Sequence, residues 1–260
     1  MRVNSRRRLG AAIAAGACAV ALGGCGSSGT HTGSGKHSPS TAGSSASPSP
    51  TSGSGSQAEE GKPAKQVLAD SKSALFNAKA VHITGGMSST AGAGVNLDMQ
   101  FQGQDAEGTL TLGGIKVGIV KTQGKLFIKA PGSFWSKTAG SKASALNGKW
   151  IKVDAKSAPG LGSFSLQGIA ASLNASGTPL NPKTTTGTVD GQPAIIVTQK
   201  DGSKLYVADS TTPVPLKIVS SSGGKKGTVR FTGYGSTRTI RPPAKALTPQ
   251  QALKGGVSKT

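Results

Sequence analysis

Side chains that could catalyse a reaction are few in this chain of 260 residues. There are three histidines and two cysteines, and only His82 among the histidines lies in a region with a periodic, domain-like pattern. A catalytic triad needs a nucleophile, a base and an orienting group in mutual reach. One histidine with scattered serines does not supply that set. We therefore expect His82 to be a surface or partly buried strand residue.

Carboxylates are the other candidates, because a pair of them can perform acid–base chemistry. Those of the periodic region are Asp70, Asp98, Asp105, Glu107, Asp154, Asp190, Asp201 and Asp209. Asp105 and Glu107 lie close together in a stretch flanked by glycine, and Asp190 and Asp201 each precede a glycine, a position typical of turns. We expect solvated turn residues. The sequence holds no Gly-rich phosphate loop, Cys-x-x-Cys or His-Glu-x-x-His. It therefore predicts no enzyme, metal site or cofactor.

The clearest chemistry belongs to Cys25. Four arginines within residues 2–8 precede an apolar run at residues 9–22, and two glycines separate this run from the cysteine. That layout is typical of a secretory signal peptide. A retained membrane helix is disfavoured, because a spanning helix needs roughly 20 apolar residues. Cys18 lies inside the run and would be removed with it.

The end of the run, Leu22-Gly23-Gly24-Cys25, resembles a bacterial lipobox. In that motif the cysteine thiol receives a diacylglycerol and becomes the first residue of the mature protein. The resemblance predicts a signal peptide at residues 1–25, lipidation of Cys25, and attachment to the extracytoplasmic face of the bacterial cell membrane. Two acyl chains anchor a protein stably. Ser5-Arg6-Arg7-Arg8-Leu9 fits both the twin-arginine export motif and an ordinary basic start, so both export routes stay open.

A long polar segment follows the cysteine. The chain is only 35% hydrophobic and contains 39 glycines, and residues 26–57 are almost entirely Gly, Ser, Thr, Pro and Ala. Such a composition buries too little apolar surface to offset the entropy of ordering, so we predict a disordered tether at residues 26–62. Its 32 residues up to position 57 would average about 30 Å end to end as a coil. Fully extended, they would reach about 100 Å.

The remaining chain predicts one α+β domain at residues 63–243 and a polar C-terminal tail at residues 244–260. Residues 64–79 have the spacing of an amphipathic helix, and Leu166, Ile169 and Leu173 predict a short second helix within residues 159–174. Asp201-Gly202 predicts a hairpin turn. Alternating apolar residues predict strands at Val95–Phe101, Leu110/Leu112, Ile115–Ile119, Leu126/Ile128, Ile195–Gln199, Lys204–Val207, Leu216/Ile218 and Val229/Phe231. A helix-covered antiparallel sheet accounts for this order of elements.

The net charge is +20, from 30 basic and 10 acidic residues. A basic protein inside the cell would suggest nucleic acid. The export signal removes that partner, and aromatic residues are too few for a base-stacking platform. The sequence therefore leaves two alternatives, an anionic membrane or cell-wall polymer as partner and a basic surface that confers only solubility. Lys225-Lys226, in a predicted Gly-Ser loop, is the most exposed candidate contact.

The order of these parts resembles the LolA-like lipoprotein superfamily, in particular its actinobacterial branch of glycolipid-carrying lipoproteins. The resemblance covers about residues 64–243. It rests on the lipobox, the helix at residues 64–79 and these segments: Ala80-Val81-His82-Ile83, Gly148-Lys149-Trp150-Ile151-Lys152-Val153, Gly187-Thr188-Val189-Asp190-Gly191 and Pro213-Val214-Pro215-Leu216.

The resemblance implies an antiparallel sheet curled into an incomplete barrel, whose open side is covered by helices and whose hollow holds acyl chains. The protein would then be a monomeric lipoprotein that binds or carries acylated lipid or glycolipid. The candidate cavity residues are Leu97, Met99, Phe101, Leu110, Leu112, Val117 and Ile119, and ordinary core packing is the alternative for each of them. The alternative function is a non-catalytic cell-wall interaction or scaffold module that uses its basic surface.

Overall fold

The computed structural model describes residues 58–89, 94–154, 161, 164–174, 177–221 and 225–254. The predicted signal peptide, Cys25 and nearly all of the predicted tether lie outside these residues. Among the described residues, no helix has the length and apolar character needed to cross a membrane.

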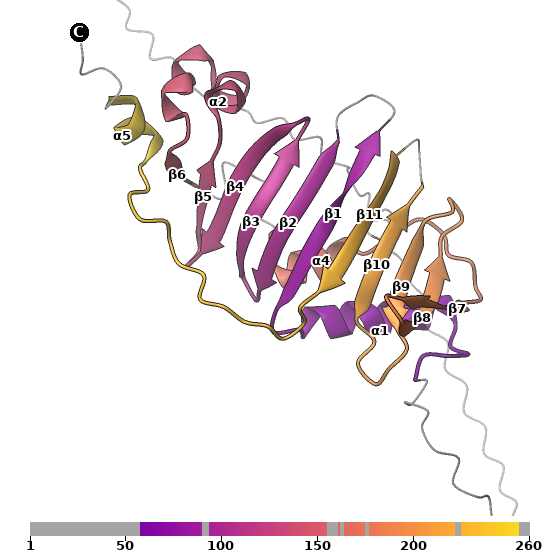
Figure 1. Ribbon diagram of the computed structural model, residues 1–260. Helices are drawn as coiled ribbons and strands as arrows, with labels where there is room; N and C mark the ends of the chain where they lie inside the picture. The colour runs from indigo at the N-terminus through magenta and orange to yellow at the C-terminus, as the bar shows by residue number, and fades with distance from the viewer. Residues whose placement is uncertain are drawn as a thin grey trace, which may run out of the picture.

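A single antiparallel sheet of 11 strands forms the body of the domain (Figure 1). The strand order is β6-β5-β4-β3-β2-β1-β11-β10-β9-β8-β7, so β6 and β7 are free edges and the sheet does not close into a barrel. The strands are β1 (Val81–Ser89), β2 (Val95–Gln102), β3 (Asp105–Leu112), β4 (Ile115–Thr122), β5 (Lys125–Lys129), β6 (Trp150–Val153), β7 (Thr185–Val189), β8 (Gln192–Thr198), β9 (Lys204–Ala208), β10 (Pro215–Ser220) and β11 (Lys225–Thr232). The predicted open, curled α+β sheet is confirmed.

Helices cover one face of this sheet and one of its ends. They are α1 (Ala64–Phe76), α2 (Gly132–Ala139), the 3₁₀ helix η1 (Ser141–Leu146), α4 (Leu166–Ser172) and α5 (Pro249–Lys254). In Figure 1, α1 and α4 lie behind the lower part of the sheet, whereas α2 and α5 lie beyond its β6 edge. We call the sheet face toward α1 and α4 the inner face and the opposite one the outer face.

Strand alternation separates the two faces, because successive side chains point to opposite sides of a sheet. The main core is on the inner face, where Met99, Ile119 and Leu126 are fully buried together with Val67 and Leu75 of α1. Two smaller apolar clusters form on the outer face, one around Leu216 and one in which Ile240 packs on Val120 and Phe127.

Glycines in the central strands allow the sheet to curl. Gly85 in β1 and Gly108 in β3 have φ angles of +129° and +151°, which side chains with a Cβ rarely adopt. A Cβ built on Gly108 would lie 2.1 Å from the carbonyl oxygen of Asp98 on the neighbouring strand. Glycines of this kind act as bending points in strongly curved sheets.

The ordered domain extends beyond the predicted limits at both ends. Glu59, inside the predicted tether, is only 2% exposed. Its backbone N–H donates to the Asp209 carboxylate at 2.9 Å, and its side chain accepts from Lys62 at 2.6 Å. This clasp fastens the first described residues to α1, since Lys62 also donates to Asp70 at 2.9 Å.

At the C-terminus, the described part of the predicted polar tail, residues 244–254, packs on the domain. Leu247 pairs its backbone with β6, donating to Trp150 and accepting from Lys152 at 2.9 and 2.8 Å. Ala252 of α5 is fully buried. Thr248 and Gln251 exchange hydrogen bonds as a capping box at the start of α5. These contacts are spaced irregularly, and for that reason they left no periodic pattern in the sequence.

Other elements differ in detail from the predictions. α1 ends at Phe76 rather than at residue 79, and the Phe76 side chain is 52% exposed. Glu107, predicted in a turn, lies within β3, and Lys225-Lys226 begins β11 instead of occupying a loop. Glu107 pairs with Gln100 and Lys226 pairs with Ser88, so neighbouring strands hold both residues in the sheet.

Candidate functional site

The seven predicted cavity residues lie on the inner face of three neighbouring strands. The register places Leu97 opposite Leu110, and Leu110 opposite Val117. All seven belong to the main core cluster or pack against it. The sequence prediction therefore brought together residues that share one surface; whether they line a ligand cavity stays a prediction.

The burial of these residues changes along the strands. Met99, Phe101 and Ile119 are fully buried, Val117 is 1% exposed and Leu110 is 8% exposed. Leu97 and Leu112, further along the same strands, are partly exposed. The inner face therefore has a closed end and an open end.

Contacts from α4 and its preceding residues form the closed end. Phe164 stacks on Phe101 with ring centroids 6.1 Å apart. The Lys121 ammonium, on the inner face of β4, donates to the Phe164 carbonyl at 3.0 Å, and burial lowers its pKa. Leu166 donates its backbone N–H to Gly103 at 3.0 Å. This end of the face is filled by protein.

The open end is built from apolar residues that meet where four strands begin or end. β1 ends beside the start of β2, and the end of β3 pairs with the start of β4, through Leu112 opposite Ile115. Met87 pairs with Val95 and is 45% exposed. We define the open end of the inner face as the five partly or largely exposed residues Met87, Val95, Leu97, Leu112 and Ile115.

Three of these five residues were absent from the sequence prediction. Val95 and Ile115 begin two of the predicted strands and share the alternation of Leu97 and Val117, so including every apolar position of those strands in the cavity set would have found them. Met87 lies in a Gly-Gly-Met-Ser stretch with no clear alternation. Its place became apparent only from the pairing of β1 with β2.

Titratable side chains on the outer face form isolated pairs. His82 Nε2 lies 2.7 Å from Asp98 Oδ1, and both side chains are solvent-exposed. Arg238 Nε contacts Glu107 Oε1 at 2.7 Å. Among the described residues, no group of three His, Cys, Asp or Glu side chains is arranged to hold a metal ion. Exposed pairs of this kind contribute little to stability.

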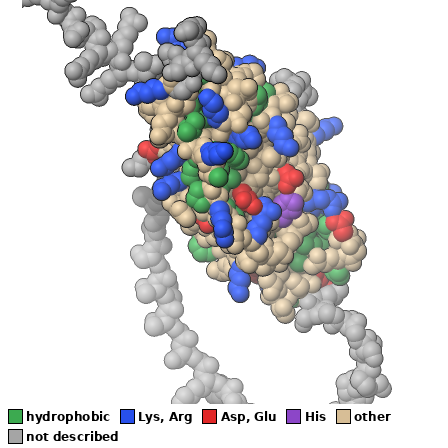
Figure 2. Space-filling model, turned by 60° about the vertical axis from the view of Figure 1, so that its left-hand side comes forward, with side chains coloured by type: hydrophobic (Ala, Val, Ile, Leu, Met, Phe, Trp, Pro, Cys, Tyr) green, Lys and Arg blue, Asp and Glu red, His purple; other side chains and the backbone are tan. Residues whose placement is uncertain are grey.

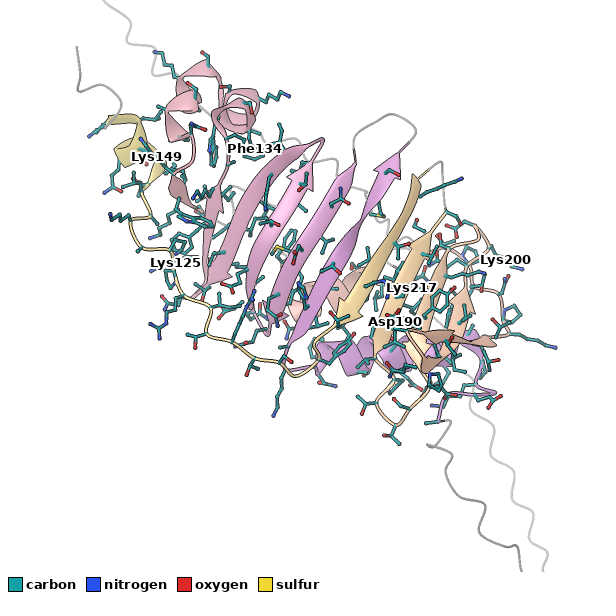
Figure 3. All side chains as sticks on the ribbon, viewed as in Figure 1. Lys125, Phe134, Lys149, Asp190, Lys200 and Lys217 are labelled. Carbon is teal, nitrogen blue, oxygen red and sulfur yellow. The ribbon has the colours of Figure 1, made fainter. Side chains whose placement is uncertain are left out.

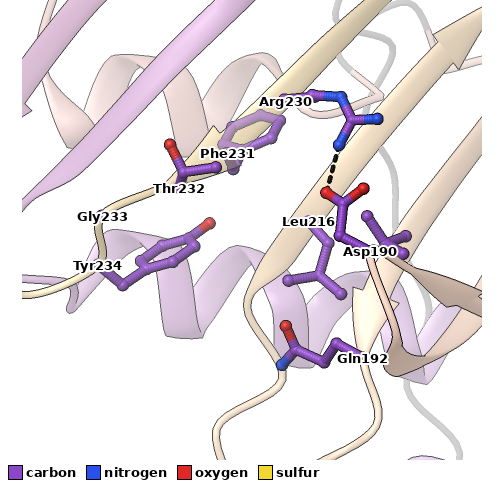
Figure 4. A pocket seen from close by; sticks show the side chains of 9 residues that line it. Asp190, Gln192, Leu216, Arg230, Phe231, Thr232, Gly233 and Tyr234 are labelled. Carbon is purple, nitrogen blue, oxygen red and sulfur yellow. Dashed lines mark hydrogen bonds and ion pairs between the residues drawn. The ribbon is translucent and has the colours of Figure 1, made fainter.

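A small pocket lies at the lower end of β11 and is lined by both polar and apolar residues (Figure 4). Arg230 and Asp190 form an ion pair across it. The Tyr234 hydroxyl donates to the Pro215 carbonyl at 2.6 Å, and burial raises the pKa of this phenol. The cavity volume is about 230 Å³, below the roughly 300–1,000 Å³ of typical small-molecule sites. It contains none of the seven predicted cavity residues.

Comparisons with known proteins give matches of fold. LprF from Mycobacterium bovis is 16% identical with a TM-score of 0.49, and 71% of this chain aligns with 100% of that one. The Mycobacterium tuberculosis lipoprotein LppX is 13% identical with a TM-score of 0.42, covering 68% of this chain and 99% of that one. A LolA superfamily protein from Nitrosomonas europaea is 12% identical with a TM-score of 0.24, covering 70% and 95%.

One of these structures is a lipoprotein and another is a LolA superfamily protein, and the likeness is one of fold alone. No protein-family profile and no curated protein matches the sequence.

Proposed function

We propose that the protein is a lipoprotein of the extracytoplasmic membrane face that binds the acyl chains of a lipid or glycolipid against the inner face of its sheet. The observation that carries this proposal is the open end. Five apolar side chains from four adjacent strands continue a filled core without being buried themselves. An acyl chain laid on them would gain roughly 0.8 kcal/mol for each methylene removed from water.

The proposed role is binding or carriage rather than catalysis. Among the described residues, Lys121 on the inner face donates to a backbone carbonyl, and Lys62 is held by Glu59 and Asp70 in the clasp beside α1. Neither brings together a nucleophile and a base. An amphiphile with its chains on the open end would instead need apolar contact, which this surface supplies.

Native mass spectrometry of the unlipidated chain from Gly26 onward would test lipid binding. This chain retains every described residue, and with them the 11 strands and the main core cluster. We expect a reproducible added mass after incubation with bacterial lipid extract, and acyl chains in the released material. A protein that keeps its bare mass throughout would overturn the proposal.

Anchoring through Cys25 is a separate part of the proposal. Replacing the thiol by a hydroxyl in Cys25→Ser removes the nucleophile that would take the lipid. We expect the wild-type protein in the membrane fraction with a diacylglycerol mass at its N-terminus. The variant should lack that modification. An unmodified wild-type Cys25 would contradict the lipobox interpretation.

A second candidate function is a non-catalytic cell-wall module, favoured by the basic surface. It predicts salt-sensitive binding of acidic polymer and no lipid adduct. Measuring the lipid adduct and measuring salt-sensitive polymer binding therefore separate the two candidate functions.

A further inference from the structure

The basic residues are distributed unevenly along the chain. Residues 113–153 contain eight lysines and no acidic residue, and residues 236–254 contain four further basic residues and again no acidic one. The first segment forms β4, β5, α2, η1 and β6. The second is distant in sequence, yet its Leu247 pairs with β6 and α5 packs against η1. The fold therefore collects two acid-free segments at one end of the sheet, which we call the lysine-rich end.

Most of these cations are free to meet a partner in solution. Lys129, Lys137 and Lys142 are exposed, and Lys149 is partly exposed. Figure 2, which turns this side of the molecule forward, shows basic side chains spread over the surface with hydrophobic side chains between them. In Figure 3, Lys149 lies beside the α2 region and Lys125 lies lower on the same side. Two of the basic residues contact other parts of the protein, since Arg238 contacts Glu107 and Lys121 contacts Phe164.

The lysine-rich end adjoins the open end of the inner face. β4 begins with Ile115, an open-end residue, and Lys116 follows it on the opposite, outer face of the same strand. Gly118 pairs with Lys129, so the end of β5 lies beside the first residues of β4, where the strands of the open end also begin or end. α2 then continues from that edge. An apolar surface and a field of positive charge thus meet at one edge of the molecule.

We propose that the lysine-rich end docks the domain on the surface of a bilayer that contains anionic phospholipid. Lysine is a compact point charge, suited to a diffuse negative surface rather than to bidentate recognition of one group. The charges are spread over strands, helices and the C-terminal segment, which fits a flat partner. Leu253, beside Lys254, is 38% exposed. Partly exposed apolar side chains among lysines are typical of surfaces that enter the lipid interface.

The predicted tether permits this orientation. The first described residues lie near α1 and β8, at the end of the sheet opposite α2 and α5 (Figure 1). An 11-stranded sheet is about 50 Å across, at close to 4.8 Å between strands. The 32 residues between Cys25 and Ala58 could span about 100 Å. An anchored domain could therefore turn its far end toward the membrane. Docking would then bring the open end next to lipid, a consequence that rests on the proposed function, although the docking itself does not.

Vesicle co-sedimentation of the unlipidated chain from Gly26 tests the inference. Phosphatidylcholine vesicles with and without phosphatidylglycerol are compared at low and high salt. The test variant carries Lys129→Gln, Lys137→Gln, Lys142→Gln and Lys149→Gln. The control carries Lys65→Gln, Lys183→Gln, Lys200→Gln and Lys204→Gln, which remove the same charge from exposed positions outside the lysine-rich end. Thermal unfolding confirms that both variants are folded.

We expect binding only to the phosphatidylglycerol vesicles, and its loss at high salt. Each lysine at such a surface contributes about fivefold in affinity, so the test variant, which lacks four of them, should bind about 600-fold more weakly. The control should stay within about tenfold of the wild type, because its lysines do not touch the membrane. Equal weakening of both variants would overturn the inference by showing a net-charge effect alone.

Two other results would also overturn it. One is equal binding to both kinds of vesicle, and the other is binding of soluble polyphosphate without binding of vesicles, which would identify an acidic polymer as the partner. Bound lipid is measured separately, as added mass in native mass spectrometry. A protein that binds vesicles and carries no acyl chain would contradict the proposed function and still support the docking surface.

Discussion

The open end of the inner face predicts a separation of lipid binding from stability. We consider the double substitution Leu97→Gln with Leu112→Gln, which places two amides among the five open-end side chains. Both leucines are partly exposed, so the amides can remain hydrated. We expect each change to lower the free energy of unfolding by less than about 1 kcal/mol.

The effect on cargo should be larger. If each leucine covers about two methylenes of an acyl chain, its loss removes about 1.5 kcal/mol of apolar contact. That is close to tenfold in affinity for each site and about 100-fold for the pair. Native mass spectrometry after lipid incubation, with lipid titrated against protein, measures this difference. Thermal and denaturant unfolding of the lipid-free chain measure stability.

Two control variants make the test specific. Asn96→Gln with Thr111→Gln changes the neighbouring positions of the same strands, which pair with each other on the outer face, and should leave the lipid adduct unchanged. Leu126→Ala creates a cavity in the core, where Leu126 is fully buried, and should cost about 2–5 kcal/mol of stability with lipid binding retained. A double variant that loses as much stability as Leu126→Ala and keeps its lipid would refute the reasoning, because the open end would then be ordinary core.

Two further predictions concern the fold. Gly108→Ala should lower the free energy of unfolding by more than about 2 kcal/mol, because the added Cβ would lie 2.1 Å from the Asp98 carbonyl oxygen. Gly94→Ala is the control, and it should change the free energy of unfolding little because its Cβ finds space. Equal melting temperatures of the two variants would contradict this account of the curl. Hydrogen bonding to Lys62 holds the pKa of Asp70 below its usual value, so the ion pair stabilises the fold above about pH 4 and the effect is lost as pH falls through the lowered pKa. The stability difference between wild type and Lys62→Met should therefore shrink in acid, and a pH-independent difference in denaturant unfolding would argue against the clasp.

The sheet was the part of the fold best predicted from sequence. Alternation in Val95–Phe101 and Ile115–Ile119 required one apolar and one polar face, and that requirement is local. Asp201-Gly202 likewise marked its hairpin, where the Asp201 carboxylate accepts the Ser203 N–H at 2.9 Å. The predicted second helix was confirmed as α4, which Ser165 caps by accepting the Gly168 N–H at 3.1 Å. In each case neighbouring residues supplied the signal.

The elements that were missed depend on distant contacts. Glu59 became part of the domain through Asp209, which is 150 residues away. α5 and the residues before it are held by contacts of Ile240, Leu247 and Ala252 with segments far away in the chain. Such contacts add stability only once the sheet has formed, so no local sequence pattern predicts them.

The sequence by itself predicted a signal peptide and a tether and determined the two-sided character of the strands, because a charged start, an apolar run and alternation are properties of neighbouring residues. It also determined that lysines lack acidic neighbours over long stretches. Tertiary structure decided which apolar residues were filled by α1 and α4 and which stayed open, since covering a face depends on elements far away in the chain. It also decided that two acid-free segments meet beside that open surface, because strand pairing, and not sequence distance, determines which charges share one side of a folded molecule.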